Sequence, residues 1–284
     1  MFRTGVAMVR VDAGVSEDTI QIKDLTKQDF IVTDQGQPQA VTNFGRESEP
    51  LDLMLLLDIS GSMQPYIRQI SDTALDAVRR LRPGDSIAIM AFGSKTALHF
   101  HFFDNHAEVI RQLRTVLDKQ DEVGFGTAIN QAIIDTARYV DKNADPSAQR
   151  AILILTDNLG LNSKANDQAA IGALLSANTV LNAIVVGRGI RPGPPKPGDD
   201  PDTTPADVYK LAEDTGGITI KAEDAGKAFD EMIGRIRDRY MIGYNLPVGA
   251  KAGEFRHIAV QLTPEARKRY PAAIIRSRPG YYVK

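Results

Sequence analysis

The sequence predicts an α/β protein with a Rossmann-like, doubly wound mixed sheet and a small β module formed by the N- and C-terminal flanks. From residue 51 to about 239, short apolar runs alternate with amphipathic segments, as in a sheet covered by helices on both faces. Residues 1–48 and 240–284 instead carry brief alternating strand patterns with little helical periodicity. The chain has 284 residues, 43% of them hydrophobic, so a substantial core is expected.

The segment LDLMLLL, residues 51–57, is apolar at nearly every position, which indicates a central strand buried on both faces. Residues 64–81 then place apolar side chains at three- and four-residue spacing, which predicts a helix. Pro83 and Gly84 would end it.

A hairpin is expected next, because SIAIMAF (86–92) and TALHFHFF (96–103) are joined only by a link around Gly93 and Ser94. A hairpin makes one strand pair antiparallel, so the sheet is predicted to be mixed. Helical periodicity follows at 107–117 and 128–140, separated by the segment DEVGFGT, which we interpret as a loop entering a helix.

The alternation continues to residue 239. Strands are predicted at 151–156, 180–187 and 217–220, and helices at 167–177, 206–214 and 225–239. Residues 188–205 are too rich in proline and glycine for regular structure and predict an exposed loop. This loop follows a strand, so it either overhangs the edge of the sheet where ligands bind in such folds and helps to select partners, or is a tolerated surface insertion.

Neither flank is long enough to bury a core alone, so the two are expected to pair into one module. The predicted organisation is an N-terminal β segment (1–48), a central domain (49–239) and a C-terminal β segment (240–284) that pairs with the first.

Composition excludes several function classes. A formal net charge of −2 gives no general attraction for nucleic acid or anionic lipid. The absence of cysteine excludes disulfides, thiolate metal sites and a cysteine nucleophile. The longest apolar run, 53–57, is too short to span a membrane. The N-terminal residues lack the apolar segment of a signal peptide, so an exported protein would have lost its signal.

Oxygen-bearing side chains follow the central strand directly. Asp58, Ser60 and Ser62 stand at its carboxyl end, where open α/β sheets bind ligands, and Gly61 allows the chain to turn there. Two more oxygen donors, Thr127 and Asp157, occupy matching ends of other elements. Hydroxyls and carboxylates suit Mg²⁺, which prefers oxygen ligands and keeps some of its waters.

This set resembles the metal-ion-dependent adhesion site (MIDAS) of von Willebrand factor A domains and integrin inserted domains. The resemblance implies that Ser60, Ser62 and Thr127 contact Mg²⁺ (or Mn²⁺ or Ca²⁺) directly. It implies that Asp58 and Asp157 act partly through water, and that a Glu or Asp carboxylate of a partner protein completes the coordination. Such a partner would be an extracellular-matrix or envelope protein.

A closer resemblance covers almost the whole chain and is to bacterial von Willebrand A-related proteins abundant in acidobacteria. It rests on the segments LTKQDFIVTDQGQPQAVTNF, RPGDSIAIMAF, LAEDTGG, RYMIGY and RPGYYVK. The resemblance implies a secreted or periplasmic protein, and a final helix at 224–239 whose shift could couple to metal coordination. TDNLG departs from the acidic cluster common in relatives, which weakens any case for a second metal site.

Simpler interpretations of the same residues exist. Ser60 or Ser62 could cap the helix expected at Gln64. The GFGT segment could cradle phosphate, although it lacks the lysine of a P-loop. His99 and His101 share one strand face and could suggest zinc, but no third ligand is evident.

The predicted function is a non-enzymatic protein-binding or adhesion module that recognises an acidic residue through a metal. One alternative is a structural interaction module with a vestigial metal site, whose β flanks make the contacts. Another is a haloacid-dehalogenase-like, Mg²⁺-dependent phosphotransferase using Asp58 as nucleophile. Such enzymes need a second acid two residues later, where this sequence has Ser60.

Overall fold

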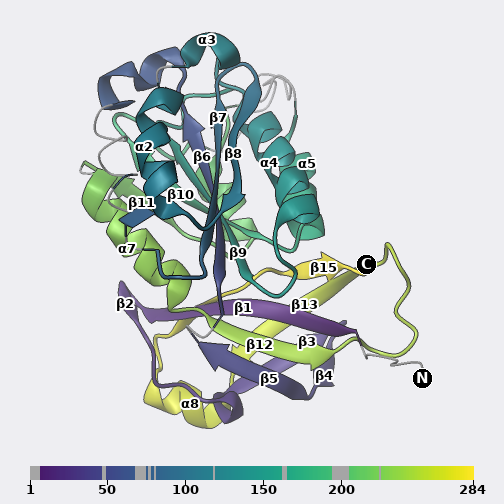
Figure 1. The fold of residues 1–284 in the computed structure, drawn as a ribbon. Helices are drawn as coiled ribbons and strands as arrows, with labels where there is room; N and C mark the ends of the chain where they lie inside the picture. The colour runs from purple at the N-terminus through teal and green to yellow at the C-terminus, as the bar shows by residue number, and fades with distance from the viewer. Residues whose placement is uncertain are drawn as a thin grey trace. The chain divides into compact units, whose positions relative to one another are not determined.

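The chain divides into two compact units in the computed structural model, which describes residues 7–46, 49–67, 75, 78, 79, 81–117, 119–161, 165–193, 205–223 and 225–284. The central unit comprises residues 50–234, and the flank unit comprises residues 1–49 and 235–284. Figure 1 shows the elements of both units.

The central unit is built on a six-stranded sheet with the order β11-β10-β9-β6-β7-β8. Every neighbouring pair is parallel except β7 and β8, so the predicted mixed, doubly wound sheet is confirmed. The strands are β6 (Leu51–Asp58), β7 (Ser86–Phe92), β8 (Thr96–Phe103), β9 (Gln149–Thr156), β10 (Val180–Val186) and β11 (Thr219–Ala222).

Strand β6 is central and all eight of its residues are buried, as its apolar sequence predicts. Helices cover the sheet on both faces, with α4 and α5 side by side on one face and α2 on the other (Figure 1). The helices are α2 (His106–Leu117), α3 (Gln120–Val123), α4 (Ile129–Asn143), α5 (Asp167–Ser176), α6 (Val208–Asp214) and α7 (Ala225–Arg237).

Some predicted elements differ from the observed ones. The helix expected at 64–81 lies mostly outside the described residues, and its start belongs to the 3₁₀ helix η2 (Gly61–Tyr66). The first three residues of DEVGFGT are not loop but part of α3, which ends where Gly124 adopts a φ of 76°. The strand predicted at 217–220 is observed as β11, which begins at Thr219, two residues later than predicted. Most of the 188–205 loop, residues 194–204, is outside the described part.

The flank unit contains two antiparallel sheets, with the orders β14-β1-β12-β5 and β15-β13-β3-β4, and β2 pairs with β1. Strand β1 of the N-terminal flank pairs with β12 and β14 of the C-terminal flank, and β3 pairs with β13. The strands are β1 (Met8–Glu17), β2 (Ile20–Gln21), β3 (Phe30–Asp34), β4 (Gln37–Gln39), β5 (Val41–Arg46), β12 (Tyr240–Asn245), β13 (Phe255–Leu262), β14 (Ile274–Arg276) and β15 (Gly280–Tyr282). A small β module formed by both flanks is thus confirmed.

A buried polar network links the two flanks within this unit. The Asp34 carboxylate is fully buried and accepts hydrogen bonds from the hydroxyls of Tyr244 and Tyr281, each at 2.8 Å. Arg256 Nε donates to the other carboxylate oxygen at 2.8 Å. Short helices η1 (Lys27–Asp29) and α8 (Pro264–Arg269), which the sequence patterns did not predict, complete the unit.

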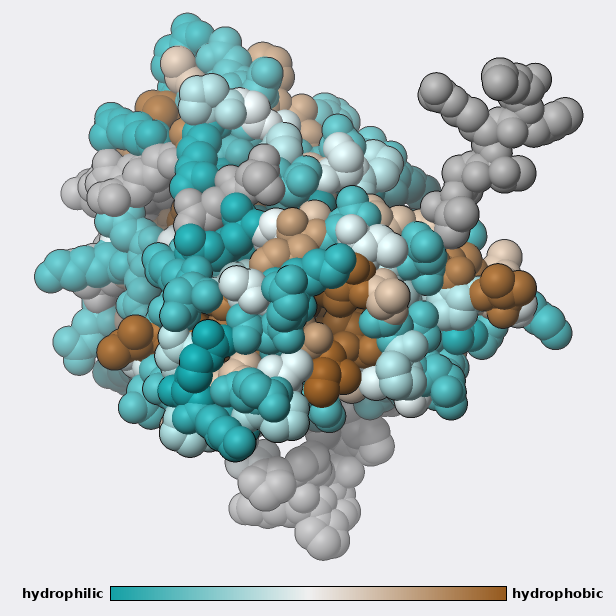
Figure 2. Space-filling model, turned by 90° about the horizontal axis from the view of Figure 1, so that it is seen from below, coloured by the Kyte–Doolittle hydropathy of each residue, from teal (hydrophilic) through white to brown (hydrophobic). Residues whose placement is uncertain are grey.

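No helix in the described part of the chain is long and apolar enough to cross a membrane. Figure 2 shows one face of the molecule, on which hydrophilic side chains predominate and apolar ones form a short strip and isolated spots. That face therefore presents no broad apolar surface.

Candidate functional site

The carboxylate of Asp58 lies at the end of β6 and is fully buried. Its Oδ1 accepts the backbone N–H of Ser60 at 3.0 Å, and its Oδ2 accepts the hydroxyl of Thr156 at 2.6 Å. Thr156 ends the neighbouring parallel strand β9, in which Leu155 pairs with Leu57. The two adjacent strand ends therefore fix the orientation of this carboxylate.

The hydroxyls of Ser60 and Ser62 face each other, with 3.3 Å between the two Oγ atoms. Ser60 precedes the helix η2 but makes no capping hydrogen bond with its side chain. Ser60 is buried, whereas Ser62 is exposed. The geometry therefore gives no support to Ser60 as a helix cap and leaves both hydroxyls directed toward one small volume.

Thr127 lies on the loop between α3 and α4, and backbone contacts bring this loop to the serines. The N–H of Gly61 donates to the Phe125 carbonyl at 3.4 Å, and the N–H of Ala128 donates to the Gly93 carbonyl at 2.8 Å. Gln120 of α3 also donates to the Ile59 carbonyl at 3.0 Å. The Thr127 loop is thus attached to the loop after β6 on one side and to the β7–β8 turn on the other.

Asp157 follows β9 directly and is 2% exposed. Its Oδ1 accepts the backbone N–H of Leu159 at 3.1 Å. The carbonyl of Thr127 lies against Gly160, where an added Cβ would stand 2.9 Å from it. Asp157 and Thr127 are therefore on neighbouring loops at the same sheet edge.

The electrostatics of Asp58 suit a bound cation. The pKa of Asp58 is raised to about 6. Burial raises it most, the hydrogen bonds from Ser60 and Thr156 lower it, and the nearby charge of Asp157 raises it. Among the described residues, no Lys or Arg forms an ion pair with either carboxylate. Two buried carboxylates that have no cationic partner among the described residues, beside two hydroxyls, fit an oxygen-coordinated divalent ion.

The structure thus brings Asp58, Ser60 and Ser62 into contact and places Thr127 and Asp157 on adjoining loops. The assignment of these five residues as metal ligands stays a prediction. The described residues contain no group of three or more His, Cys, Asp or Glu side chains suited to a metal. An ion held at this edge by the described residues would therefore need the hydroxyls as well as the carboxylates.

Zinc binding by the histidines of β8 is not supported. His101 Nδ1 lies 2.9 Å from the Tyr139 hydroxyl, and His99 Nδ1 lies 3.9 Å from a carboxylate oxygen of Glu122. Each imidazole therefore faces a separate partner, with no third ligand among the described residues.

Asn158 is a structural residue of the site that the sequence patterns did not reveal. It is buried at a φ of 55°, a conformation that Asn tolerates better than most residues. Its Nδ2 donates to the Ile190 carbonyl at 3.1 Å, and its Oδ1 accepts the Val208 N–H at 3.2 Å. Asn158 therefore ties the loop after β9 to the loop after β10 and to the start of α6. The only sequence signal is an Asn directly after Asp157.

Gly189 gives a direct test of how closely these loops pack. A Cβ added there would lie 2.1 Å from the Asp157 carbonyl oxygen and 2.6 Å from a methyl carbon of Val185. We expect Gly189→Ala to lower the free energy of unfolding by about 1–3 kcal/mol, as overpacking does, when measured by chemical denaturation. Gly193→Ala, in open space on the same loop, is the matched control. Equal stability of the two variants would contradict the packing described here.

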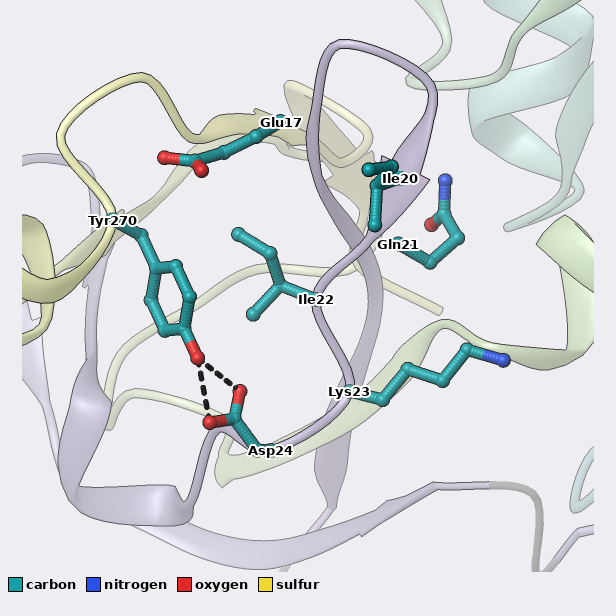
Figure 3. Close-up of a pocket in the computed structure, with 7 residues that line it drawn as sticks. All are labelled: Glu17, Ile20, Gln21, Ile22, Lys23, Asp24 and Tyr270. Atoms are coloured by element: carbon teal, nitrogen blue, oxygen red, sulfur yellow. Dashed lines mark hydrogen bonds between the residues drawn. The ribbon is translucent and has the colours of Figure 1, made fainter.

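The flank unit contains a separate pocket of about 340 Å³, lined by residues 17 and 20–24 together with Tyr270 (Figure 3). Four of its polar side chains, those of Glu17, Lys23, Asp24 and Tyr270, have partners within the unit. The Tyr270 hydroxyl donates to Asp24 at 2.5 Å, the Ala272 N–H donates to Glu17 at 3.1 Å, and Lys23 pairs with Asp238 at 2.7 Å. We assign no ligand to this pocket.

Comparison with known protein families finds a match within the central unit. Residues 53–160 match the family model of the von Willebrand factor type A domain. No curated protein matches the chain.

Solved structures of low sequence identity share the fold. An aerotolerance-related membrane protein from Bacteroides fragilis NCTC 9343 is 19% identical, with 66% of this chain and 98% of that chain covered and a TM-score of 0.51. A von Willebrand factor type A protein from Catenulispora acidiphila is 12% identical, with 92% and 71% covered and a TM-score of 0.52. Proximal thread matrix protein 1 from the mussel byssus, with a zinc-occupied MIDAS motif, is 16% identical, with 72% and 50% covered and a TM-score of 0.51.

The likeness to these structures concerns the fold. The segment that matches the family model, residues 53–160, contains every predicted site residue from Asp58 to Asp157. The chain therefore contains a von Willebrand factor type A domain.

Proposed function

We propose that this chain is a non-enzymatic binding protein that holds a divalent cation, Mg²⁺ or alternatively Mn²⁺ or Ca²⁺, and through it binds a Glu or Asp side chain of a partner protein. The observation that carries the proposal is the buried Asp58 carboxylate, which has no cationic partner among the described residues and lies beside two facing serine hydroxyls.

The five residues would have two kinds of role. The hydroxyls of Ser60, Ser62 and Thr127 would hold the ion, while Asp58 and Asp157 would balance its charge and orient its waters. Because three of the five ligands are neutral, a bound ion would retain enough positive charge to attract an external carboxylate.

The arrangement favours binding over phosphoryl transfer. A nucleophilic carboxylate needs a free oxygen that the substrate can reach. Both oxygens of Asp58 accept hydrogen bonds, and the side chain is fully buried. The position two residues later is Ser60, which cannot act as a general acid.

The partner and location remain part of the proposal. The net charge of −2 supports a protein partner over nucleic acid. We propose a matrix or envelope protein as partner and an extracytoplasmic location, on the resemblance of the flanking segments to exported relatives.

Isothermal titration with Mg²⁺ and Mn²⁺ tests the proposal. We expect one ion per chain, and Ser62→Ala to weaken binding by more than about 10-fold, because it removes a direct ligand where even outer partners contribute 10–100-fold. Ser176→Ala is the matched control, since among the described residues the Ser176 hydroxyl donates only to the Gly172 carbonyl of its own helix. An absence of ion binding by the wild type would refute the proposal and favour a vestigial site.

A further inference from the structure

Four large apolar side chains are exposed around the proposed metal site: Phe125, Leu159, Leu161 and Ile190, which we call the apolar rim. They are between 53% and 70% exposed. We infer that the rim selects a partner segment in which the metal-binding Glu or Asp is flanked by apolar side chains. This inference rests on the proposed function, because the carboxylate itself would be bound through the ion.

Two rim residues are attached by their backbones to predicted metal ligands or their immediate neighbours. The Phe125 carbonyl accepts the N–H of Gly61, the residue between Ser60 and Ser62. The Leu159 N–H donates to the carboxylate of Asp157 at 3.1 Å. The rim therefore begins on two different loops of the site itself.

The other two rim residues lie on segments that pack against these loops. The Ile190 carbonyl accepts the side-chain N–H of Asn158 at 3.1 Å. Leu161 forms a β-bridge with Pro205, and the preceding Gly160 accepts the Ala206 N–H at 2.9 Å and lies against the Thr127 carbonyl. All four side chains are therefore carried by hydrogen-bonded backbone at one edge of the sheet.

This concentration of apolar side chains is unusual for the central unit. Among its described residues, six large hydrophobic side chains are exposed, and four of them form the rim; the other two are Leu98 and Phe103 of β8. Single exposed apolar residues need no explanation, but a cluster on ordered loops around a polar site marks a binding surface.

The charge distribution defines the occupant. The rim segments 125–126 and 159–161 contain no charged side chain. On the third loop, Ile190 lies between two arginines: Arg188 is exposed, and Arg191 is engaged by Glu213 at 2.7 Å. The ion would attract the partner's carboxylate, while the apolar residues beside that carboxylate would meet the uncharged segments 125–126 and 159–161. A segment with apolar residues on both sides of one acidic residue matches both features.

Three fluorescent heptapeptides with capped ends test the inference: GSLELSG, GSSESSG and GSLQLSG. Anisotropy is measured with Mn²⁺-saturated protein, after the Mn²⁺ affinity of each protein has been determined by titration. We expect wild type to bind GSLELSG at least about 10-fold more tightly than GSSESSG, because two leucines become buried. Chelation of Mn²⁺ and replacement of the central Glu in GSLQLSG should each abolish binding.

Leu159→Ser should remove most of the preference for GSLELSG, while Leu98→Ser, the same change at an exposed position of β8, should retain it. Equal affinities of the wild type for GSLELSG and GSSESSG would overturn the inference that the apolar rim selects the partner, while leaving the proposed metal site intact. Failure of the wild type to bind Mn²⁺ would overturn both the proposed function and the inference about the apolar rim.

Discussion

Replacement of Asp58 by Asn should abolish the stabilisation of this protein by Mg²⁺. At a Mg²⁺ concentration about 100 times its Kd, binding to the native state alone would stabilise wild type by about 2.7 kcal/mol. The Asn side chain has the same shape but no charge, and we expect it to weaken binding by more than the 10–100-fold typical of outer ligands. Thermal unfolding with and without Mg²⁺ measures the effect.

The metal-free variant provides the internal control for this substitution. The buried Asp58 carboxylate is costly to ionise, as its pKa of about 6 indicates, and a neutral amide avoids that cost. The amide loses one of the two hydrogen bonds that the carboxylate accepts from Ser60 and Thr156. Because this loss offsets the gain from removing a buried charge, we expect the metal-free Tm to change little. A Mg²⁺-dependent increase in Tm as large as that of wild type would exclude Asp58 from the metal site.

Replacement of Arg256 by Met should strongly destabilise the flank unit. Arg256 Nε is 2.8 Å from Asp34, whose carboxylate is fully buried. Removal of one partner from a buried ion pair costs about 3–5 kcal/mol, because the remaining charge is left without compensation. We expect a loss of this size in the free energy of unfolding measured by chemical denaturation.

The two tyrosine hydroxyls cannot replace the arginine. Burial, followed by the hydrogen bond to Asp34, raises the pKa of Tyr281 to about 12, and the same causes raise that of Tyr244. Both therefore remain neutral donors at pH 7. Arg138→Met is the matched control, because Arg138 is exposed and its ion pair with Asp135 is long, at 3.9 Å. Comparable losses in the two variants would contradict the importance of the Asp34 network.

The central sheet was predictable because its strands have distinctive sequences. Strands β6, β9 and β10 are buried on both faces and are apolar almost throughout, and β7 and β8 are separated only by a short turn. Helices α3 and α8 were not predicted, because four and six residues are too few to establish a helical period. Strand β11 starts after Gly217, where a Cβ would collide with the Leu181 carbonyl, a contact that no local pattern reveals.

The candidate site was partly predictable for a similar reason. Asp58, Ser60 and Ser62 are neighbours in sequence and follow a buried strand directly, so their proximity is local. Thr156 and Asn158 were missed, because their partners are distant in sequence. The hydroxyl of Thr156 reaches Asp58 only through the register of β6 and β9, and Asn158 acts through residues more than 30 positions away.

A crystal structure of the chain grown with Mn²⁺, with anomalous diffraction data, tests the central claim most directly. We predict one strong anomalous peak in the central unit, between the Ser60 and Ser62 hydroxyls and at coordination distance from both. It should lie beside Asp58, Thr127 and Asp157. No anomalous peak at this edge, or a peak only elsewhere in the molecule, would contradict the account.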